Sequence, residues 1–169
     1  MRRFLDLLFG SFLYVLYLLL NPFIFAYLKL SGVDSPYRYF NGIGQFGNIL
    51  RVKIYNIGYY QSVDDDAFSK TTSPNHFLYK TNLFKLPLVI RVLKGNMSLV
   101  GPQILNDKFA LELIDKYTDF HKRFAPKPGV FSPSCYYRFE NRQDDYSNEL
   151  RDDLNYASRQ TLKSYLNTL

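Results

Sequence analysis

A long hydrophobic run lies close to the N-terminus of the chain. From Leu7 to Leu28 no residue is charged, and the run reads LLFGSFLYVLYLLLNPFIFAYL. About 20 apolar residues are enough for a helix to cross the hydrocarbon core of a bilayer. Arg2 and Arg3 precede the run, and positive residues beside a membrane helix favour the cytoplasmic side. The pattern therefore predicts a membrane helix over residues 1–30 with a cytoplasmic N-terminus.

Asn21 and Pro22 interrupt this run. A proline inside a helix removes a backbone donor and clashes with the preceding turn, so we expect a kink or a break there, and the Asn21 amide can bond a freed carbonyl. A sharp break gives a re-entrant helix that enters and leaves the cytoplasmic leaflet, whereas a straight helix places the residues after Lys29 outside the cell. A signal peptide is disfavoured because the run is long and no small-residue cleavage site follows it. A buried core helix is the remaining alternative.

The rest of the chain, residues 31–169, predicts one small domain of mixed α/β class in which helices dominate. Residues 37–60 read as short extended segments around glycines, with moderate alternation of apolar residues. Residues 62–75 are polar and predict a surface loop. Three segments carry apolar residues at helical spacing: 76–93, 107–123 and 148–169. Gly95 follows the first of these and is expected to end its helix.

Composition narrows the class of partner. The chain has 15 Tyr, 15 Phe and no Trp, and amphipathic tyrosine suits a membrane–water boundary. A formal net charge of +6 attracts anionic headgroups, phosphorylated ligands or nucleic acid. Nucleic acid is not expected, because the chain has no arginine-rich tract and no zinc or recognition-helix motif. Cys135 is the single cysteine, which excludes an internal disulfide, and we expect a packed thiol in a reducing compartment.

Three further patterns carry little chemistry. Asp64–Asp66 supply hard oxygen ligands, but consecutive residues rarely converge on one ion, so a solvated loop is expected. His76 and His121 are far apart in sequence and have no ligand-like partners beside them. Gly42-x-Gly44-x-x-Gly47 has the dinucleotide-binding spacing, but no capped helix follows it, so we expect a loop. The sequence therefore predicts no metal site and no dinucleotide.

The most specific pattern is the run LKGNMSLVGP at residues 93–102. It resembles the hallmark of the bacterial sugar transferase family, the monotopic polyprenyl-phosphate phosphoglycosyl transferases. The motif positions are Lys94, Gly95, Met97, Ser98, Leu99, Val100, Gly101 and Pro102. The similarity extends to the opening RRFLD, to Asn21-Pro22 where the family has Ser-Pro, to Leu86-Pro87 and to Lys127-Pro128-Gly129. It covers residues 1–135 and fades beyond them.

The resemblance implies a re-entrant membrane helix and a domain on the cytoplasmic face of the inner membrane. Such enzymes move a sugar phosphate from a nucleotide sugar to polyprenyl phosphate. Their chemistry resembles a two-step covalent mechanism in which an aspartate attacks the phosphoryl group. A neighbouring glutamate completes the pair, and Mg²⁺ offsets the phosphate charge. In the family this Asp-Glu pair stands immediately before Leu-Pro.

The chain departs from the family where the resemblance places the chemistry. Phe84 and Lys85 occupy the positions of the Asp-Glu pair, and no gap separates Leu86-Pro87 from the register of the hallmark. Phenylalanine has no nucleophile, and lysine brings a positive charge to the place of the metal. Other residues that the family uses are replaced here by Gly42, Asn56, Gln103, Ile104 and Phe131-Ser132. We therefore expect no catalytic residue, and Mg²⁺ only if the chain is active.

Hypotheses of different classes follow. The favoured one is a catalytically inactive partner or regulator of an intact phosphoglycosyl transferase in polysaccharide, including exopolysaccharide, or glycoconjugate biosynthesis. It would contact a homologue or a second copy, with Tyr136-Tyr137 as a candidate surface. The alternative is an active transferase of altered mechanism that uses another carboxylate, such as Asp107. A third is a non-catalytic sensor of polyprenyl phosphate. The candidate phosphate-binding residues are Lys85, Arg91, Lys94, Gln103 and Lys127.

Overall fold

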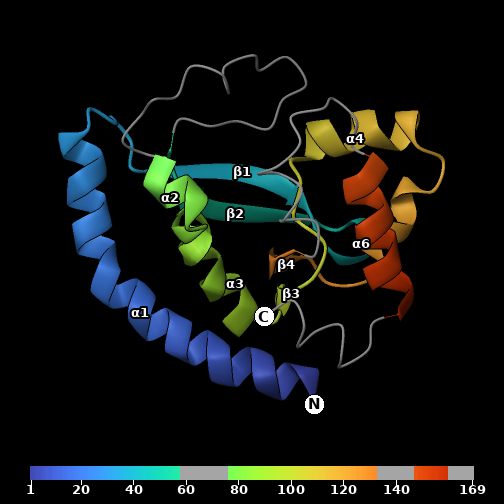
Figure 1. The fold of residues 1–169 in the computed structure, drawn as a ribbon, viewed down its shortest axis with the longest axis horizontal. Coiled ribbons are helices and arrows are strands. Elements are labelled where there is room, and N and C mark those ends of the chain that lie inside the picture. Colours follow the sequence, from blue (N-terminus) through green and yellow to red (C-terminus); the bar gives the residue numbers. More distant parts are fainter. Residues whose placement is uncertain (58–75, 133–146, 160–169) are drawn as a thin grey trace.

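The computed structural model describes residues 1–57, 76–132 and 147–159, which form a helix-dominated mixed α/β fold (Figure 1). Asp64–Asp66, Cys135 and Tyr136-Tyr137 lie outside these residues. The elements, with η for 3-10 helices, are α1 Arg2–Leu30, β1 Tyr37–Ile43, η1 Gln45–Gly47, β2 Ile49–Tyr55, α2 His76–Lys80, η3 Leu83–Leu88, α3 Val89–Leu93, β3 Ser98–Val100, α4 Asp107–Lys116, η4 Phe120–Phe124, β4 Gly129–Phe131 and α6 Ser147–Arg159. In Figure 1, α1 runs along one side and α4 and α6 cover the other, with the β1–β2 hairpin between them.

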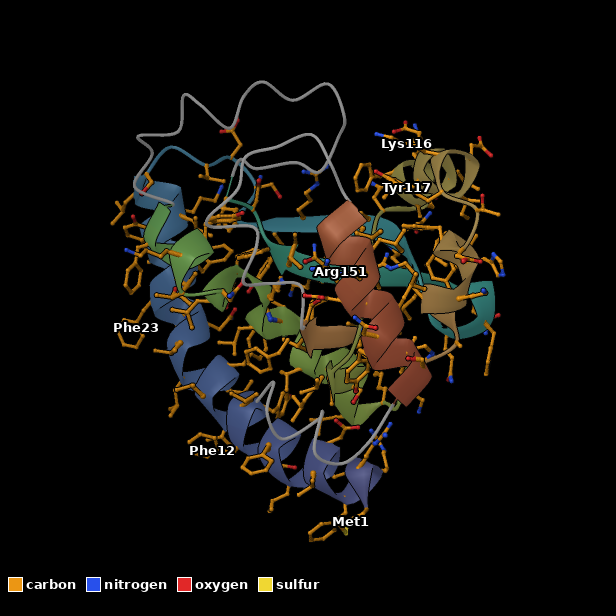
Figure 2. The ribbon with its side chains drawn as sticks, turned by 45° about the vertical axis from the view of Figure 1, so that its right-hand side comes forward. Met1, Phe12, Phe23, Lys116, Tyr117 and Arg151 are labelled. Carbon is orange, nitrogen blue, oxygen red and sulfur yellow. The ribbon has the colours of Figure 1, made fainter. Side chains whose placement is uncertain are left out.

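The long helix α1 has one packed face and one exposed apolar face. Its buried residues are Asp6, Gly10, Tyr17, Ile24 and Leu28, and this face contacts η3, α3 and β3. The exposed face carries large apolar side chains, among them Phe4, Phe12, Val15, Leu19 and Phe23. Figure 2 shows Phe12 and Phe23 pointing away from the rest of the chain. Within the described ranges, α1 is the one helix long and apolar enough to cross a membrane, and so extended an apolar surface is suited to lipid.

Contrary to prediction, α1 does not break at Asn21-Pro22. The helix is continuous through both residues, and it curves along its length (Figure 1). A proline removes one helical hydrogen bond, and the turns on both sides of Pro22 stay helical because they pack against the domain at Tyr17, Ile24 and Leu28. The predicted interruption of the helix is therefore wrong, and α1 is curved along its whole length instead.

The Asn21 side chain joins α1 to the hairpin instead of bonding a freed carbonyl. Its Oδ1 accepts hydrogen bonds from the Tyr37 hydroxyl and, at 2.7 Å, from the Tyr55 hydroxyl. The two tyrosines are cross-strand partners with ring centroids 5.4 Å apart. Burial, with the neighbouring Tyr37 and Tyr17 hydroxyls, raises the pKa of Tyr55, so this hydroxyl stays protonated and donates. The amide oxygen of this polar residue in the apolar helix thus receives its hydrogen bonds from two tyrosines of the hairpin.

The β1–β2 hairpin confirms the extended segments predicted in residues 37–60. The strands are antiparallel, with Tyr37 opposite Tyr55 and Ile43 opposite Ile49. The Gly44 N–H donates to the Asn48 carbonyl at 2.7 Å across the turn. Gly42-x-Gly44-x-x-Gly47 accordingly lies at the end of the hairpin, which confirms the loop that the sequence predicted. Its last glycine has φ +81°, which favours glycine there.

The single helix predicted over residues 76–93 is three short ones, α2, η3 and α3. Asn82 adopts a left-handed conformation with φ +56°, which ends α2 after one turn. Pro87 lies inside η3 and has no N–H for an α-helical hydrogen bond. Local chemistry thus overrides the apolar periodicity. The predicted stop at Gly95 is confirmed, with φ +83° at that residue.

The two later helical predictions hold in part. The segment 107–123 contains α4, whose Asn106 N-cap accepts from the Lys108 N–H at 2.9 Å. The chain then becomes extended at Tyr117, and η4 follows as a separate turn that contains His121. In the C-terminal segment the structure describes α6, which confirms the helix over its range.

Candidate functional site

The hallmark motif supplies one strand of a buried two-stranded pair. Its Ser98–Val100 portion is β3, which pairs in parallel with β4 from the Lys-Pro-Gly segment. The Ser98 N–H donates to the Pro128 carbonyl at 2.9 Å, and the Gly101 N–H donates to the Phe131 carbonyl at 3.0 Å. The two matching motifs, far apart in sequence, are therefore one structural unit, which we call the β3–β4 clasp.

Two glycines let the backbones of the clasp approach. A Cβ on Gly101 would lie 2.3 Å from the Lys127 carbonyl oxygen, and a Cβ on Gly129 would lie 2.1 Å from the Gly101 nitrogen. No side chain fits at such distances, so glycine is required by close approach of the chain. These motif residues are thus explained by packing.

The opening RRFLD attaches α1 to the clasp. The buried Asp6 carboxylate accepts from the Leu99 N–H at 2.8 Å and from the Ser98 hydroxyl at 2.9 Å. The Arg3 guanidinium donates to the last two carbonyls of α3, at 2.6 and 2.8 Å. Carbonyls at a helix C-terminus lack intrahelical partners and favour a cation. The basic start therefore has a structural role in addition to any effect on membrane orientation.

A buried ion pair attaches α6 to the segment after the motif. The Arg123 Nε donates to Asp153 at 3.1 Å, and another guanidinium N–H donates to the Gln103 carbonyl at 3.0 Å. Arg123 is 1% exposed and Asp153 is 0% exposed. Nearby, the Tyr156 hydroxyl donates to the Val100 carbonyl at 3.0 Å, and burial raises the pKa of Tyr156.

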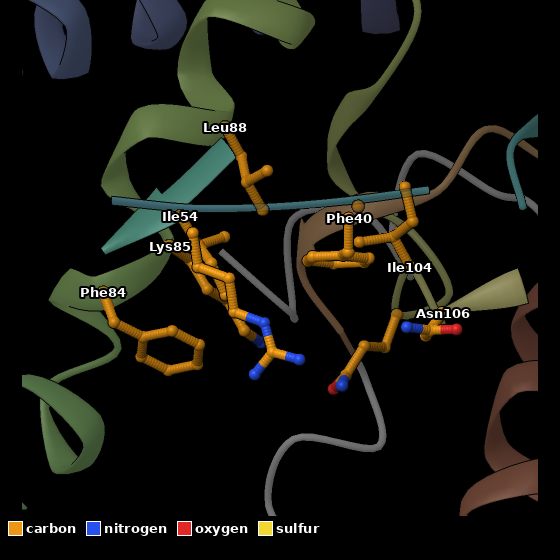
Figure 3. A pocket seen from close by; sticks show the side chains of 10 residues that line it. Phe40, Ile54, Phe84, Lys85, Leu88, Ile104 and Asn106 are labelled. Carbon is orange, nitrogen blue, oxygen red and sulfur yellow. The ribbon is translucent and has the colours of Figure 1, made fainter. Parts of the chain in front are cut away.

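A cavity of ≈ 70 Å³ lies between the hairpin, η3 and the segment after the clasp. Its lining residues are Arg38, Phe40, Ile54, Phe84, Lys85, Leu88, Gln103, Ile104, Asn106 and Gly129. Figure 3 shows the Phe84 ring at one end and Ile104 with Asn106 at the other. Among the lining residues that the structure describes, two are cationic, Arg38 and Lys85, and none is Asp or Glu. We call it the Phe84–Lys85 cavity.

Comparison with known proteins shows the family to which this sequence belongs. The family model "Bacterial sugar transferase" matches residues 1–169. The chain belongs to the bacterial sugar transferase family. It is also similar to the exopolysaccharide production protein PSS of Rhizobium leguminosarum bv. phaseoli, with 29% identity over 131 residues that cover 67% of this chain and 63% of that protein. The match thus spans less than two thirds of the relative. The family likeness reaches the C-terminus, beyond the residues over which the motifs alone indicated it.

The structure brings together only part of the predicted phosphate-binding set. Lys85 and Gln103 line the Phe84–Lys85 cavity. Arg91 donates to the Arg51 carbonyl, and Lys94 is exposed after α3. Lys127 lines a separate depression of ≈ 300 Å³ beside the hairpin turn. Three of the five predicted phosphate-binding residues, Arg91, Lys94 and Lys127, are therefore not among the residues that line the cavity.

Two polar residues of the cavity lining were not predicted. Arg38 comes from β1 and Asn106 from the N-cap of α4. Arg38 and Phe40 are two residues apart on one strand, so their side chains leave the same face. That alternation was the one signal in the sequence that could have placed Arg38 beside Phe40.

Two departures from the family pattern lie against each other. A Cβ on Gly42 would lie 2.6 Å from Ile104 Cγ1. A side chain at position 42 would therefore require Ile104 to move. The chain departs from the family pattern at both positions, and the two are in contact.

The remaining candidate residues lie away from the cavity. Asp107, the carboxylate of the altered-mechanism hypothesis, is half-buried at the start of α4, where its Oδ1 accepts from the Lys108 N–H at 2.9 Å. It does not line the cavity, although its neighbour Asn106 does. Among residues 1–57, 76–132 and 147–159, no three His, Cys, Asp or Glu residues are grouped as they would be around a metal ion.

Proposed function

We propose that this chain is a membrane-bound, catalytically inactive member of the bacterial sugar transferase family. It acts as a partner or regulator of an active phosphoglycosyl transferase in the production of exopolysaccharide or a related glycan. The observation that carries the proposal is the Phe84–Lys85 cavity, which lies where the resemblance puts the Asp-Glu pair and has no carboxylate among the lining residues that the structure describes.

Attack on a phosphoryl group needs a nucleophile with a free lone pair. The phenyl ring of Phe84 has none, and the Lys85 ammonium repels the divalent cation that would offset the phosphate charge. In the described part of the chain the buried carboxylates are Asp6 and Asp153. Both are already held, Asp6 by β3 and Asp153 by Arg123, so neither supports transfer at the cavity.

The packing of α1 supports a domain that stays on one side of the membrane, and Arg2 and Arg3 favour the cytoplasmic side. Arg3 and Asp6 near one end of α1, and Asn21 and Leu28 toward the other, all contact the same domain. If α1 crossed the bilayer as a straight helix, one of its ends would lie on the side of the membrane opposite the domain and could not contact it. The arrangement favours a helix that enters and leaves one leaflet, with its outer apolar face in lipid.

Residues after α1 are expected to react from the cytoplasm. In a Cys135→Ser background, Asp34→Cys would be labelled by a membrane-impermeant maleimide in inside-out vesicles and not in right-side-out vesicles. Ser11→Cys is the matched control, because Ser11 lies on the exposed face of α1 and lipid would protect it from both sides. Labelling of Asp34→Cys from outside the cell would establish a spanning helix.

The test of function is gentle extraction of the tagged chain from its native membrane, with identification of the proteins that co-purify. We expect stoichiometric recovery of a homologue that keeps Asp-Glu before its Leu-Pro. The purified chain by itself should transfer no labelled sugar phosphate from nucleotide sugars to polyprenyl phosphate.

The double variant Phe84→Asp/Lys85→Glu is the matched control. It should still recover the partner and still lack transfer, because Gly42, Gln103 and Ile104 also differ from the family pattern. Transfer by the unmodified chain, lost in Asp107→Ala, would contradict the proposal and support an altered mechanism. Recovery of the chain without any homologue would remove the partner role.

A further inference from the structure

One face of the β1–β2 hairpin is open to the outside of the domain along much of its length. Residues two apart on a strand leave the same face of a sheet, and cross-strand partners share it. We call this set the hairpin face, and its members in the register of the strands are Tyr37, Tyr39 and Asn41 of β1 with Tyr55, Lys53 and Arg51 of β2. Tyr39 is 54% exposed, and Asn41 and Arg51 are exposed as well.

The hairpin face points toward the helix that carries the exposed apolar surface. At one end of this face, the hydroxyls of Tyr37 and Tyr55 donate to Asn21 of α1. The Tyr37 ring also lies 5.9 Å, between centroids, from the ring of Phe25, which is 38% exposed on α1. The other residues of the hairpin face follow directly along the strands. The apolar surface of α1 therefore continues onto the hairpin.

Two cations of the hairpin face lie over tyrosine rings. The Arg51 Cζ is 5.4 Å from the centroid of the Tyr39 ring, and the Lys53 Nζ is 3.5 Å from that of Tyr37. Neither strand contains an Asp or a Glu, so the charge of this face is positive. Tyrosine is enriched where membrane proteins meet the headgroup layer, and lysine and arginine extend their charged ends to the same layer.

The position of the hairpin face beside α1 identifies its partner. A further cation–tyrosine pair in the described part of the chain, Lys116 with Tyr117, lies at the end of α4. It is on the opposite side of the domain from Phe12 and Phe23 (Figure 2), so such a pair alone does not indicate lipid. A surface continuous with a lipid-facing helix meets the headgroups, and the cytoplasmic leaflet attracts basic residues because its headgroups are anionic.

We propose that the hairpin face is a second membrane-contact surface, which lies on anionic phospholipid headgroups through Tyr39, Arg51 and Lys53. It rests on the proposed function in one respect, since it requires α1 to lie in the membrane on the side of the domain. A second contact beside α1 limits rotation of the domain about the axis of that helix. It thereby fixes which surface of the domain is offered to a partner.

Fluorescence quenching by headgroup-nitroxide lipid tests this surface on the full chain, in nanodiscs of equal parts phosphatidylglycerol and phosphatidylcholine. In a Cys135→Ser background, bimane on Asn41→Cys reports the hairpin face. Bimane on Leu111→Cys is the matched control, because Leu111 is 59% exposed on α4. We expect about threefold stronger quenching of the Asn41 label, and a smaller difference in phosphatidylcholine alone, where the attraction of the cations is lost.

Charge variants separate headgroup binding from mere closeness to the bilayer. Arg51→Gln/Lys53→Gln should lower the quenching of the Asn41 label to its level in phosphatidylcholine alone, and Arg51→Lys should keep it. Lys116→Gln also removes a cation from a tyrosine ring and should leave the quenching unchanged. Equal quenching of the two labels, or equal effects of the double variant and Lys116→Gln, would overturn the proposal. Thermal unfolding identifies misfolded variants, and Arg51→Lys then decides the case.

The outcome is distinguishable from failure of the proposed function, because the nanodiscs contain no partner and no sugar donor. Cytoplasmic labelling of Asp34→Cys with no quenching of the Asn41 label would overturn the hairpin face as a membrane contact and leave the proposed function intact. If Asn41→Cys were unquenched in nanodiscs but protected from maleimide in native membranes, the face would bind a protein instead. Strong quenching without a co-purified homologue would support the hairpin face and remove the partner role.

Discussion

Gly101→Ala is expected to prevent folding or to lower the free energy of unfolding by about 3–5 kcal/mol. The new Cβ would lie 2.3 Å from the Lys127 carbonyl oxygen and 2.9 Å from the Gly129 nitrogen. Both are backbone atoms held in the β3–β4 clasp, so relief of the overlap requires that clasp hydrogen bonds break. Urea unfolding in detergent micelles, followed by far-UV circular dichroism, measures the change in midpoint and slope.

Gly47→Ala is the matched control at the tip of the hairpin. Nothing lies within 4 Å of a Cβ there, but φ is +81°, so backbone strain alone costs about 1–2 kcal/mol. The difference between the two variants isolates the close approach in the clasp. If both unfold at the same urea concentration, the packing role assigned to Gly101 is wrong.

The clasp explains how this chain keeps a family motif beside an altered cavity. Ser98, Leu99 and Val100 are engaged by the Lys-Pro-Gly segment, by Asp6 and by Tyr156 of α6, within the domain interior. Phe84 and Lys85 instead line the cavity, where replacement leaves those contacts untouched. Selection for folding and selection for chemistry therefore act on different residues, and the first can persist when the second has ceased.

Periodicity and turn chemistry predicted the elements whose signals are local. The apolar run of α1, the glycine-rich hairpin and the stop at Gly95 are examples, and each is present. The break at Asn21-Pro22 and the single helix over residues 76–93 were wrong. In both places the outcome depends on partners distant in sequence or on one backbone conformation, such as φ +56° at Asn82. The spacing of apolar residues gives no information on partners distant in sequence or on the backbone conformation of a single residue.

The candidate site was predicted in part, for a similar reason. The family resemblance fixed positions 84, 85 and 103, and all three meet at the cavity. Lys94 and Lys127 belong to the matching motifs and Arg91 is a cation beside the first of them, but Arg91 bonds the Arg51 carbonyl, Lys94 is exposed, and Lys127 lines a separate depression. Arg38 belongs to a strand far from the motif, and only the packing of β2 against η3 brings the hairpin to the cavity.

The Arg123–Asp153 pair had no signal in the sequence, because isolated charges in amphipathic segments read as solvent-exposed. Arg123→Met is expected to lower the free energy of unfolding by about 3–5 kcal/mol, because it leaves the Asp153 carboxylate buried without its cation. Asp153 is 0% exposed and also accepts from the Ser132 hydroxyl at 3.4 Å, which is too long to replace the guanidinium. Urea unfolding in micelles again gives the value.

The double variant Arg123→Met/Asp153→Leu should be more stable than Arg123→Met, because replacing both members of a buried pair removes the unpaired charge. A double-mutant cycle thus separates the attraction within the pair from the desolvation of one member. The exposed pair of Lys122 with Asp119, 2.7 Å apart and about 60% exposed on each side, is the control. Asp119→Asn should leave the midpoint unchanged, because water already solvates both groups. A single Arg123→Met variant as stable as Asp119→Asn would mean that α6 is held to the domain by its apolar contacts, with Tyr156 and Leu150 in place of the ion pair.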